Sequence, residues 1–210
     1  MARPEIKYNI NELIDSLVTA DKDACDFTDI VDLHNGINRN LHLGIIDCDI
    51  ADAIDSFIRF FNTQDEQNNL PIEKRKPIKI YIDSIGGDIM GTLTIIDTVR
   101  QSKTPVWTIN VGQAYSGGFF CFIAGHKRIS YPNASFLFHE GSTGTFGDAN
   151  KFNNWADFYK KILSKLRELT LKFTNIAEEE YNEHQKDDWW FFADEALEKG
   201  ICDEISTEFI

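Results

Sequence analysis

A single hydroxyl group lies in a glycine-containing turn between two apolar segments of the chain. Val106–Val111 is apolar and rich in β-branched residues, which predicts a buried strand, and Phe119–Ala124 has the composition of a buried helix. We therefore expect Ser116 at a strand-to-helix turn, where the first N–H groups of the helix are unpaired and the helix dipole favours an anion. A serine there can cap the helix, or it can be a nucleophile beside anion-stabilising N–H groups.

A histidine follows a second apolar segment further along the chain. Ser135–His139 predicts a short strand that ends in the histidine. A histidine at this place can be a packed residue at the edge of the core, or it can be a general base. Serine at its ordinary pKa is a weak nucleophile, so a neighbouring imidazole must take its proton during attack. A carboxylate on the far ring nitrogen would fix the tautomer and stabilise the imidazolium ion.

A second glycine turn precedes both residues. The alternating segment Ile78–Asp83 predicts a strand, and it leads through Ser84 and Ile85 into Gly86-Gly87. The pair can be a turn that needs positive φ, or it can present backbone N–H groups to a phosphate or an oxyanion. The surrounding sequence has neither the G-x-G-x-x-G pattern nor the G-K-[ST] ending of a nucleotide-binding loop, so nucleotide binding is weakly supported.

Strands and helices alternate through the segments that must position these groups. Apolar residues of 54–61 at i, i+3, i+4 and i+7 predict a helix, and the polar, proline-containing stretch Thr63–Pro77 predicts a loop. Other expected elements are a strand at Leu41–Asp47, a helix through Met90 and Val99, and a helix at Ile10–Leu17. This order predicts an α/β fold with βαβ crossovers and a mostly parallel sheet.

Composition restricts the classes of function. At 210 residues with 42% hydrophobic residues, the chain is expected to fold as one globular domain. Its net charge of −13 disfavours binding to nucleic acid or to an anionic membrane surface. The start of the chain has no apolar signal region, and no apolar run is long enough to span a bilayer. The cysteines form no C-x-x-C pair, which fits a reducing cytoplasm and indicates no metal or cofactor; they are Cys25, Cys48, Cys121 and Cys202.

Four motifs together resemble the ClpP-type serine peptidases, the proteolytic subunit of the Clp protease. They are Ile82–Asp88, Gly112–Gly118, Tyr131–His139 and Phe192–Asp203, and the resemblance runs from about Arg39 to Ile205. It implies a ClpP/crotonase-like spiral of βαβ units with a projecting handle helix. We accordingly divide the chain into a divergent N-terminal segment, residues 1–38, and a peptidase domain, residues 39–210, with the handle at about 141–174.

The resemblance also implies roles for particular residues. Ser116 would be the nucleophile and His139 the general base. The family's acid lies five residues before an Ala-x-Glu-Ala motif, which selects Asp188, although a shift of one residue would select Asp187. The oxyanion would be bound by the backbone N–H groups of Gly87 and Gly117.

Several positions depart from the family pattern. Gly117-Gly118 replaces the usual Met-Gly, Glu140-Gly141 replaces Gln-Pro, and Ser84-Ile85-Gly86 replaces Ser-Pro-Gly. Trp189-Trp190 is bulkier than expected beside the acid, and residues 1–38 do not match the family's N-terminal axial loop. The chain therefore resembles a diverged member, of the kind that a phage or mobile element encodes.

The segment from Asn150 to Thr174 predicts one long helix. Its apolar residues step by three and four through three heptads, which is typical either of a helix packed on its own domain or of an oligomer interface; they are Phe152, Trp155, Tyr159, Ile162, Leu166, Leu169 and Phe173. In ClpP-like proteins the matching region is the handle that interlocks two stacked rings.

The preferred interpretation is a serine endopeptidase that cleaves unfolded polypeptide inside a homo-oligomeric ring assembly. The resemblance implies an AAA+ unfoldase of the Clp family as partner and a cytoplasmic location. The alternatives are a phage head-maturation protease, a catalytically inactive scaffold subunit, and an acyl-CoA enzyme of the crotonase type. The last would leave Ser116 and His139 without a role, and the sequence shows no basic cluster for the phosphates of coenzyme A.

Overall fold

The computed structural model describes residues 34–210, so the helix predicted at Ile10–Leu17 lies outside the described residues. The chain divides into two compact units, Met1–Asn38 and Arg39–Ile210, and the fold described below is that of the second unit. No helix within residues 34–210 is long and apolar enough to cross a membrane.

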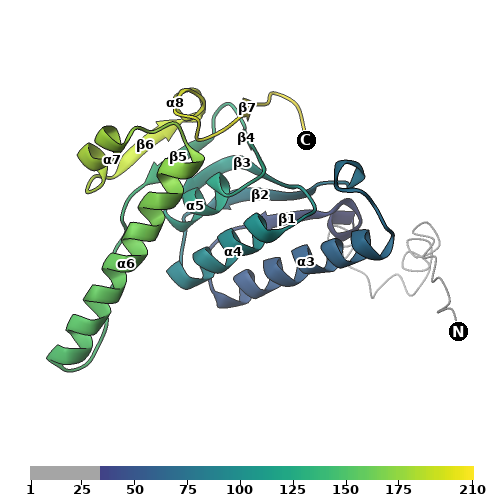
Figure 1. Ribbon diagram of the computed structural model, residues 1–210. Coiled ribbons are helices and arrows are strands. Elements are labelled where there is room, and N and C mark those ends of the chain that lie inside the picture. Colours follow the sequence, from purple (N-terminus) through teal and green to yellow (C-terminus); the bar gives the residue numbers. More distant parts are fainter. Residues whose placement is uncertain (1–33) are drawn as a thin grey trace, which may run out of the picture. The chain divides into compact units, whose positions relative to one another are not determined.

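A largely parallel sheet forms the centre of this unit (Figure 1). Its strands follow the order β1-β2-β3-β4-β7, and each neighbouring pair on this path is parallel. Their bounds are β1 Asn40–Leu43, β2 Ile78–Ser84, β3 Val106–Tyr115, β4 Lys127–Ser130 and β7 Glu204–Ile205. Parallel strands need crossover connections, and the helices between these strands supply them. The expected α/β fold with βαβ units is therefore confirmed.

Strand β3 belongs to two parts of the sheet. Its first half pairs with β4, whereas Gln113–Tyr115 pairs with β5, Ser135–Phe138, also in parallel. Strand β6, Trp189–Phe192, then adds to β5 in the antiparallel direction. The sequence predicted that β3 would end at Val111, because Gly112 and Gln113 interrupt the apolar run. The strand continues to Tyr115 because β5 supplies a second partner beyond that point.

The helices that follow β1, β2 and β3 bury their apolar faces against the sheet. They are α3 Cys48–Gln67, α4 Ile89–Gln101 and α5 Gly117–Ile123. Figure 1 shows α3 and α4 lying side by side along the sheet. The predicted face of α3 is buried through Ile54, Ile58 and Phe61. Helix α5 is buried along its whole length, which explains its continuously apolar sequence.

Two predicted boundaries were wrong near α3. The strand expected at Leu41–Asp47 ends at Leu43, because Asp47 is the N-cap of α3 and accepts a hydrogen bond from the N–H of Ile50 at 2.8 Å. The loop expected from Thr63 begins later, because α3 continues to Gln67; a short 3-10 turn, η1 Ile72–Lys74, lies inside that loop.

The predicted long helix is α6, Ala149–Phe173, and it projects beyond the sheet (Figure 1). Its C-terminal half packs on the domain's own core through Ile162 and Leu166, which are 3% exposed. Its N-terminal half exposes Phe152 and Phe158. The heptad pattern therefore combines an intradomain face with a partly exposed one.

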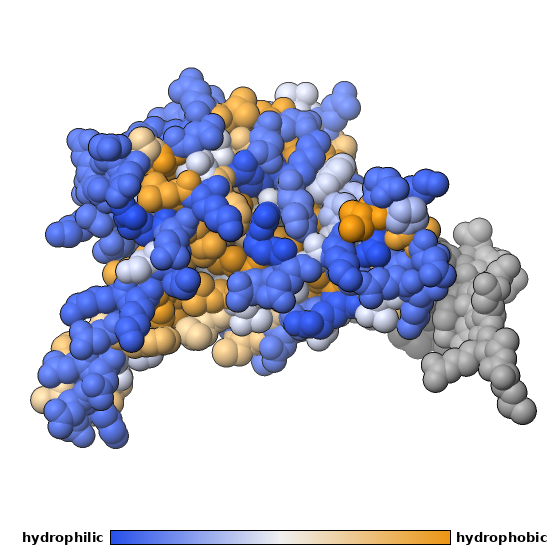
Figure 2. Space-filling view, in the orientation of Figure 1, coloured by the Kyte–Doolittle hydropathy of each residue, from blue (hydrophilic) through white to orange (hydrophobic). Residues whose placement is uncertain are grey.

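A groove of about 590 Å³ lies between α4 and α6. Apolar side chains line it, among them Leu93, Ile96 and Ile162, together with lysines of α6. Figure 2 shows apolar surface gathered between the hydrophilic residues of α6 and the adjoining helices.

The C-terminal part contains two short helices, α7 Glu178–His184 and α8 Ala193–Glu198. Tyr181 of α7 is 2% exposed and makes an edge contact with Phe138 of β5. This contact joins α7 to the strand that leads to His139.

Candidate active site

Two glycine turns meet at the carboxyl ends of the adjacent strands β2 and β3. One is Gly86-Gly87 between β2 and α4, and the other is Ser116-Gly117 between β3 and α5. A Cβ placed on Gly86, which has φ +93°, would lie 2.8 Å from both the backbone nitrogen of Gly117 and the Cβ of Ser116. Glycine at this position therefore lets the two turns touch.

The N–H of Gly87 points away from Ile46, its partner in an isolated parallel bridge. The N–H of Ile46 donates to the carbonyl of Gly86 at 2.9 Å, and the N–H of Asp88 donates to the carbonyl of Ile46 at 2.8 Å. This parallel bridge leaves the N–H of Gly87 without an acceptor among residues 34–210. A Cβ on Gly87, where φ is +150°, would lie 2.0 Å from the carbonyl oxygen of Ile46, so no side chain fits there.

Gly117 supplies a second free donor beside the first. It is the first residue of α5, so its N–H has no partner within the helix, and it donates to no other group among the described residues. A Cβ on Gly117 would lie 3.6 Å from the nitrogen of Gly87 and 2.4 Å from Oγ1 of Thr92. The buried Thr92 side chain thus occupies the space that the family's usual methionine would need, which accounts for glycine at this position.

Ser116 has a backbone conformation that is unusual for serine. Its φ is +53° and its ψ is −121°, and its N–H donates to the carbonyl of Leu137 at 2.9 Å. Strained conformations of this kind cost about 1–3 kcal/mol and persist where surrounding contacts fix them. The side chain makes no capping hydrogen bond to α5. The capping interpretation of Ser116 is therefore wrong in this structure.

The pairing of β5 with β6 decides which aspartate meets His139. The antiparallel register joins Phe138 to Trp189, so the next residues outward, His139 and Asp188, lie opposite each other. The Nδ1 atom of His139 lies 3.1 Å from Oδ1 of Asp188. Asp187 instead lies near His184, with 3.4 Å between Oδ2 and Nδ1.

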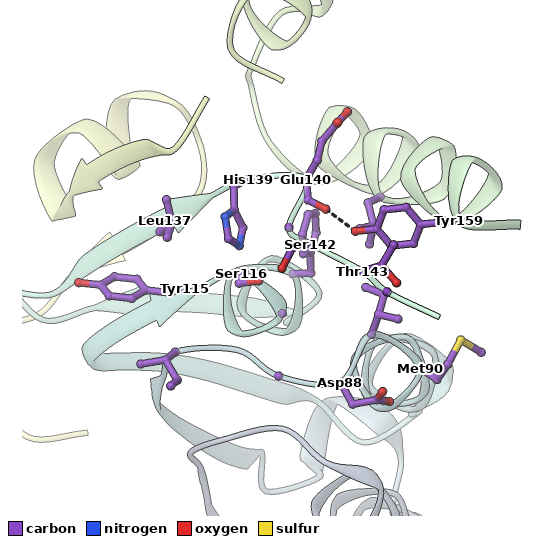
Figure 3. A pocket seen from close by; sticks show the side chains of 18 of the residues that line it. Asp88, Met90, Tyr115, Ser116, Leu137, His139, Glu140, Ser142, Thr143 and Tyr159 are labelled. Carbon is purple, nitrogen blue, oxygen red and sulfur yellow. Dashed lines mark hydrogen bonds between the residues drawn. The ribbon is translucent and has the colours of Figure 1, made fainter. Parts of the chain in front are cut away.

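These groups surround one cavity of about 540 Å³. Gly87, Ser116, Gly117 and His139 all line it, and apolar walls come from neighbouring residues such as Phe120, Leu137 and Met90. Figure 3 shows the His139 ring, carried at the end of β5, directed toward Ser116 at the start of α5. The structure thus brings the predicted serine, histidine and backbone donors to one cavity, with Asp188 behind the histidine.

The segment after His139 forms the opposite wall and is bound to α6. The Tyr159 hydroxyl donates to the carbonyl of Glu140 at 2.8 Å (Figure 3), and Nε1 of Trp155 donates to Oγ1 of Thr143 at 3.0 Å. Burial, assisted by the Glu140 carboxylate, raises the pKa of Tyr159, so its hydroxyl remains a donor. Gly141 has φ +73°, which glycine allows where the family has proline.

Sequence reasoning did not assign Trp155 and Tyr159 to the site. Their spacing indicated only a helix face, because no local pattern reveals that α6 folds back along the segment after His139. Within residues 34–210, no group of three or more His, Cys, Asp or Glu side chains could hold a metal ion.

Comparison with known proteins agrees with the class of fold described above. The family model described as Clp protease matches residues 53–209, and the chain belongs to this family of peptidases. It is 33% identical over 132 residues to the ATP-dependent Clp protease proteolytic subunit 2 of Treponema pallidum (strain Nichols). That match covers 62% of this chain and 66% of the relative. The expected ClpP/crotonase-like fold is thereby confirmed.

Proposed function

We propose that the chain is a serine endopeptidase in which Ser116 is the nucleophile, His139 the general base and Asp188 the acid. The observation that carries the proposal is the pairing of His139 with Asp188 beside a serine whose side chain does not cap α5. This serine adjoins two backbone N–H groups that have no acceptor within residues 34–210. Each of these features has a chemical use in acyl transfer, and together they form one constellation.

The proposed reaction gives each of these groups one role. Oγ of Ser116 attacks the peptide carbonyl carbon while its proton passes to Nε2 of His139, and Nδ1–H of the imidazolium donates to Asp188. The N–H groups of Gly87 and Gly117 bind the tetrahedral oxyanion. His139 then gives the proton to the leaving amine, and the carbon–nitrogen bond breaks to leave an acyl-serine. A water molecule then gives a proton to His139 and attacks that ester. The proton passes from His139 to Oγ as the acyl–oxygen bond breaks, which releases the carboxyl product and restores Ser116.

The lining of the cavity favours polypeptide over an acyl-CoA thioester. Its described residues include Asp88 and Glu140 and contain no lysine or arginine, so they offer no counter-charge to the phosphates of coenzyme A. The chain segment 140–144 runs along the cavity and can meet an extended substrate backbone.

Assembly into stacked rings is part of the proposal. It is supported by family membership, by the projection of α6, and by the exposed Phe152 and Phe158 on that helix. The apolar groove between α4 and α6 offers further surface for a second copy of the chain. An AAA+ unfoldase as partner and unfolded polypeptide as substrate, in the cytoplasm, complete the proposal by family resemblance.

Covalent labelling with a fluorophosphonate tests the proposal directly. The native protein and Ser116→Ala would be compared by intact mass after exposure to the reagent. We expect one adduct on the native protein and none on the variant, because only an activated serine reacts. Absence of an adduct on the native protein, both alone and with a Clp-type unfoldase, would favour the inactive scaffold instead.

A further inference from the structure

Trp190 is a large exposed side chain close to the proposed catalytic residues. It belongs to β6 and is 53% exposed, although its neighbour Phe191 is 2% exposed. Alternation along the strand explains the difference, because Phe191 faces the core and Trp190 faces outward. Phe192, two residues further along the same face, is 61% exposed, so exposed apolar side chains gather on the outward face of β6, as they do at binding surfaces.

Trp190 belongs to a row of apolar side chains that crosses three strands. Tyr115 of β3 pairs with Leu137 of β5, and Leu137 pairs with Trp190 of β6. The rings of Tyr115 and Trp190 meet edge to face, with centroids 5.1 Å apart and an interplanar angle of 85°. Leu137, between the two in this row, is 7% exposed. We call this row of Tyr115, Leu137 and Trp190 the aromatic shelf.

The tyrosine and leucine of the shelf also border the cavity. The Tyr115 hydroxyl shares a hydrogen bond of 2.7 Å with Oγ of Ser135, which fixes the ring. Tyr115 and Leu137 also line the cavity that contains Ser116. Figure 3 shows Leu137 of β5 beside His139, with the Tyr115 ring on the same side of the cavity.

The next row of the same sheet holds the proposed catalytic pair. His139 lies two residues after Leu137, and Asp188 lies two residues before Trp190, so all four side chains share one face of the β5–β6 pair. A substrate whose scissile bond lies between Ser116 and His139 therefore passes close to the aromatic shelf.

We propose that the aromatic shelf binds a large apolar side chain of the polypeptide substrate, a few residues from the scissile bond, and that Trp190 is a specificity-determining residue. The inference rests on the proposed peptidase function. A pre-fixed pair of rings offers much apolar area at little entropic cost, and the Tyr115 hydroxyl is already hydrogen-bonded. The shelf thus selects for apolar area, not for a hydrogen-bonding group.

Peptide libraries measured with matched variants test this inference. The native protein, Trp190→Ala, Trp190→Phe and Phe60→Ala would be compared on internally quenched peptides that carry Leu, Phe, Arg or Ser at each position around a common cleavage site. Phe60 of α3 is a suitable control because it is an aromatic residue with 59% exposure on a different element.

Loss of the shelf should act on one substrate position. We expect Trp190→Ala to lower kcat/KM about tenfold or more for peptides with Leu or Phe at that position, and less than about twofold for Ser there. Trp190→Phe should retain most of the preference, and Phe60→Ala should change nothing. Fluorophosphonate labelling rates should be equal in all four proteins, because the reagent has no side chain for the shelf.

Other outcomes would overturn the inference. An equal loss for every peptide would assign Trp190 a structural role, and a preference for Arg would mean that the shelf binds cations. Dissociation of the assembly by Trp190→Ala, seen in sedimentation, would place the residue at an interface between copies. In each of these cases the native protein still reacts with the fluorophosphonate; if it does not, the proposed function itself fails.

Discussion

Replacing Asp188 by asparagine should reduce peptidase turnover by about 10²–10³-fold. The expected loss follows from the exposure of the pair, because the Asp188 side chain is 66% exposed and that of His139 is 29% exposed. Two unit charges about 4 Å apart attract by about 1 kcal/mol in water and about 4 kcal/mol at an effective dielectric constant of about 20. These limits correspond to about fivefold and about 10³-fold in rate. Asparagine also favours the wrong imidazole tautomer, which places the loss in the upper part of this range but below the roughly 10⁴-fold effect at a buried acid.

The assay is kcat on an internally quenched peptide, together with the rate of fluorophosphonate labelling. Asp187→Asn is the matched control, because Asp187 is 62% exposed, adjoins Asp188 and lies near His184. We expect it to change either rate by less than about threefold. Thermal unfolding should be nearly unchanged in both variants. If Asp187→Asn shows the large loss and Asp188→Asn does not, the argument from the β5–β6 register is refuted.

Three further predictions concern stability. The free energy of unfolding should be about 1 kcal/mol higher for Ser116→Gly than for Ser116→Ala, because only glycine is unstrained at φ +53°. This reverses the usual order of the two residues. Urea denaturation would measure the difference, and a less stable glycine variant would contradict the strain. Burial, assisted by Arg100, lowers the pKa of His126, so the unfolded state binds more protons and stability should fall as pH drops below about 6.5. His126→Gln should flatten that slope in calorimetry, and an unchanged slope would exclude this histidine as its source. Asp65→Ala should lower the free energy of unfolding by about 3–5 kcal/mol, because it removes the carboxylate that pairs with the buried Arg39. A decrease below about 1 kcal/mol in urea denaturation would contradict this.

The elements of the fold were largely predictable because their signals are local. Apolar periodicity indicated α3, α4 and α6, and the apolar runs indicated β2 and the first half of β3. The motif positions of Ser116 and His139 also lie where the sequence indicated, at the ends of strands. Such features depend on a few neighbouring residues, which a sequence displays directly.

The choice between Asp187 and Asp188 could not be made from residue patterns alone. It depends on a register between β5 and β6, strands that are 50 residues apart in the chain, and a shift of one residue would exchange the two carboxylates between faces. The same limit applies to Tyr159, whose hydrogen bond to the Glu140 carbonyl exists only because α6 folds back along the cavity. Pairings that close long loops leave no local trace in composition or spacing.

Three of the positions where this chain departs from the family pattern lie against another side chain of the described residues. Thr92 occupies the space beside Gly117 that a methionine would need, and Tyr159 fixes the backbone next to Gly141 that a proline would otherwise restrict. Trp190 packs against Tyr115 at the edge of the same cavity. These contacts lie around His139 and the two N–H groups that have no acceptor within residues 34–210, where an inactive protein would not need them. The matched contacts therefore favour an active peptidase with an altered substrate surface over an inactive scaffold.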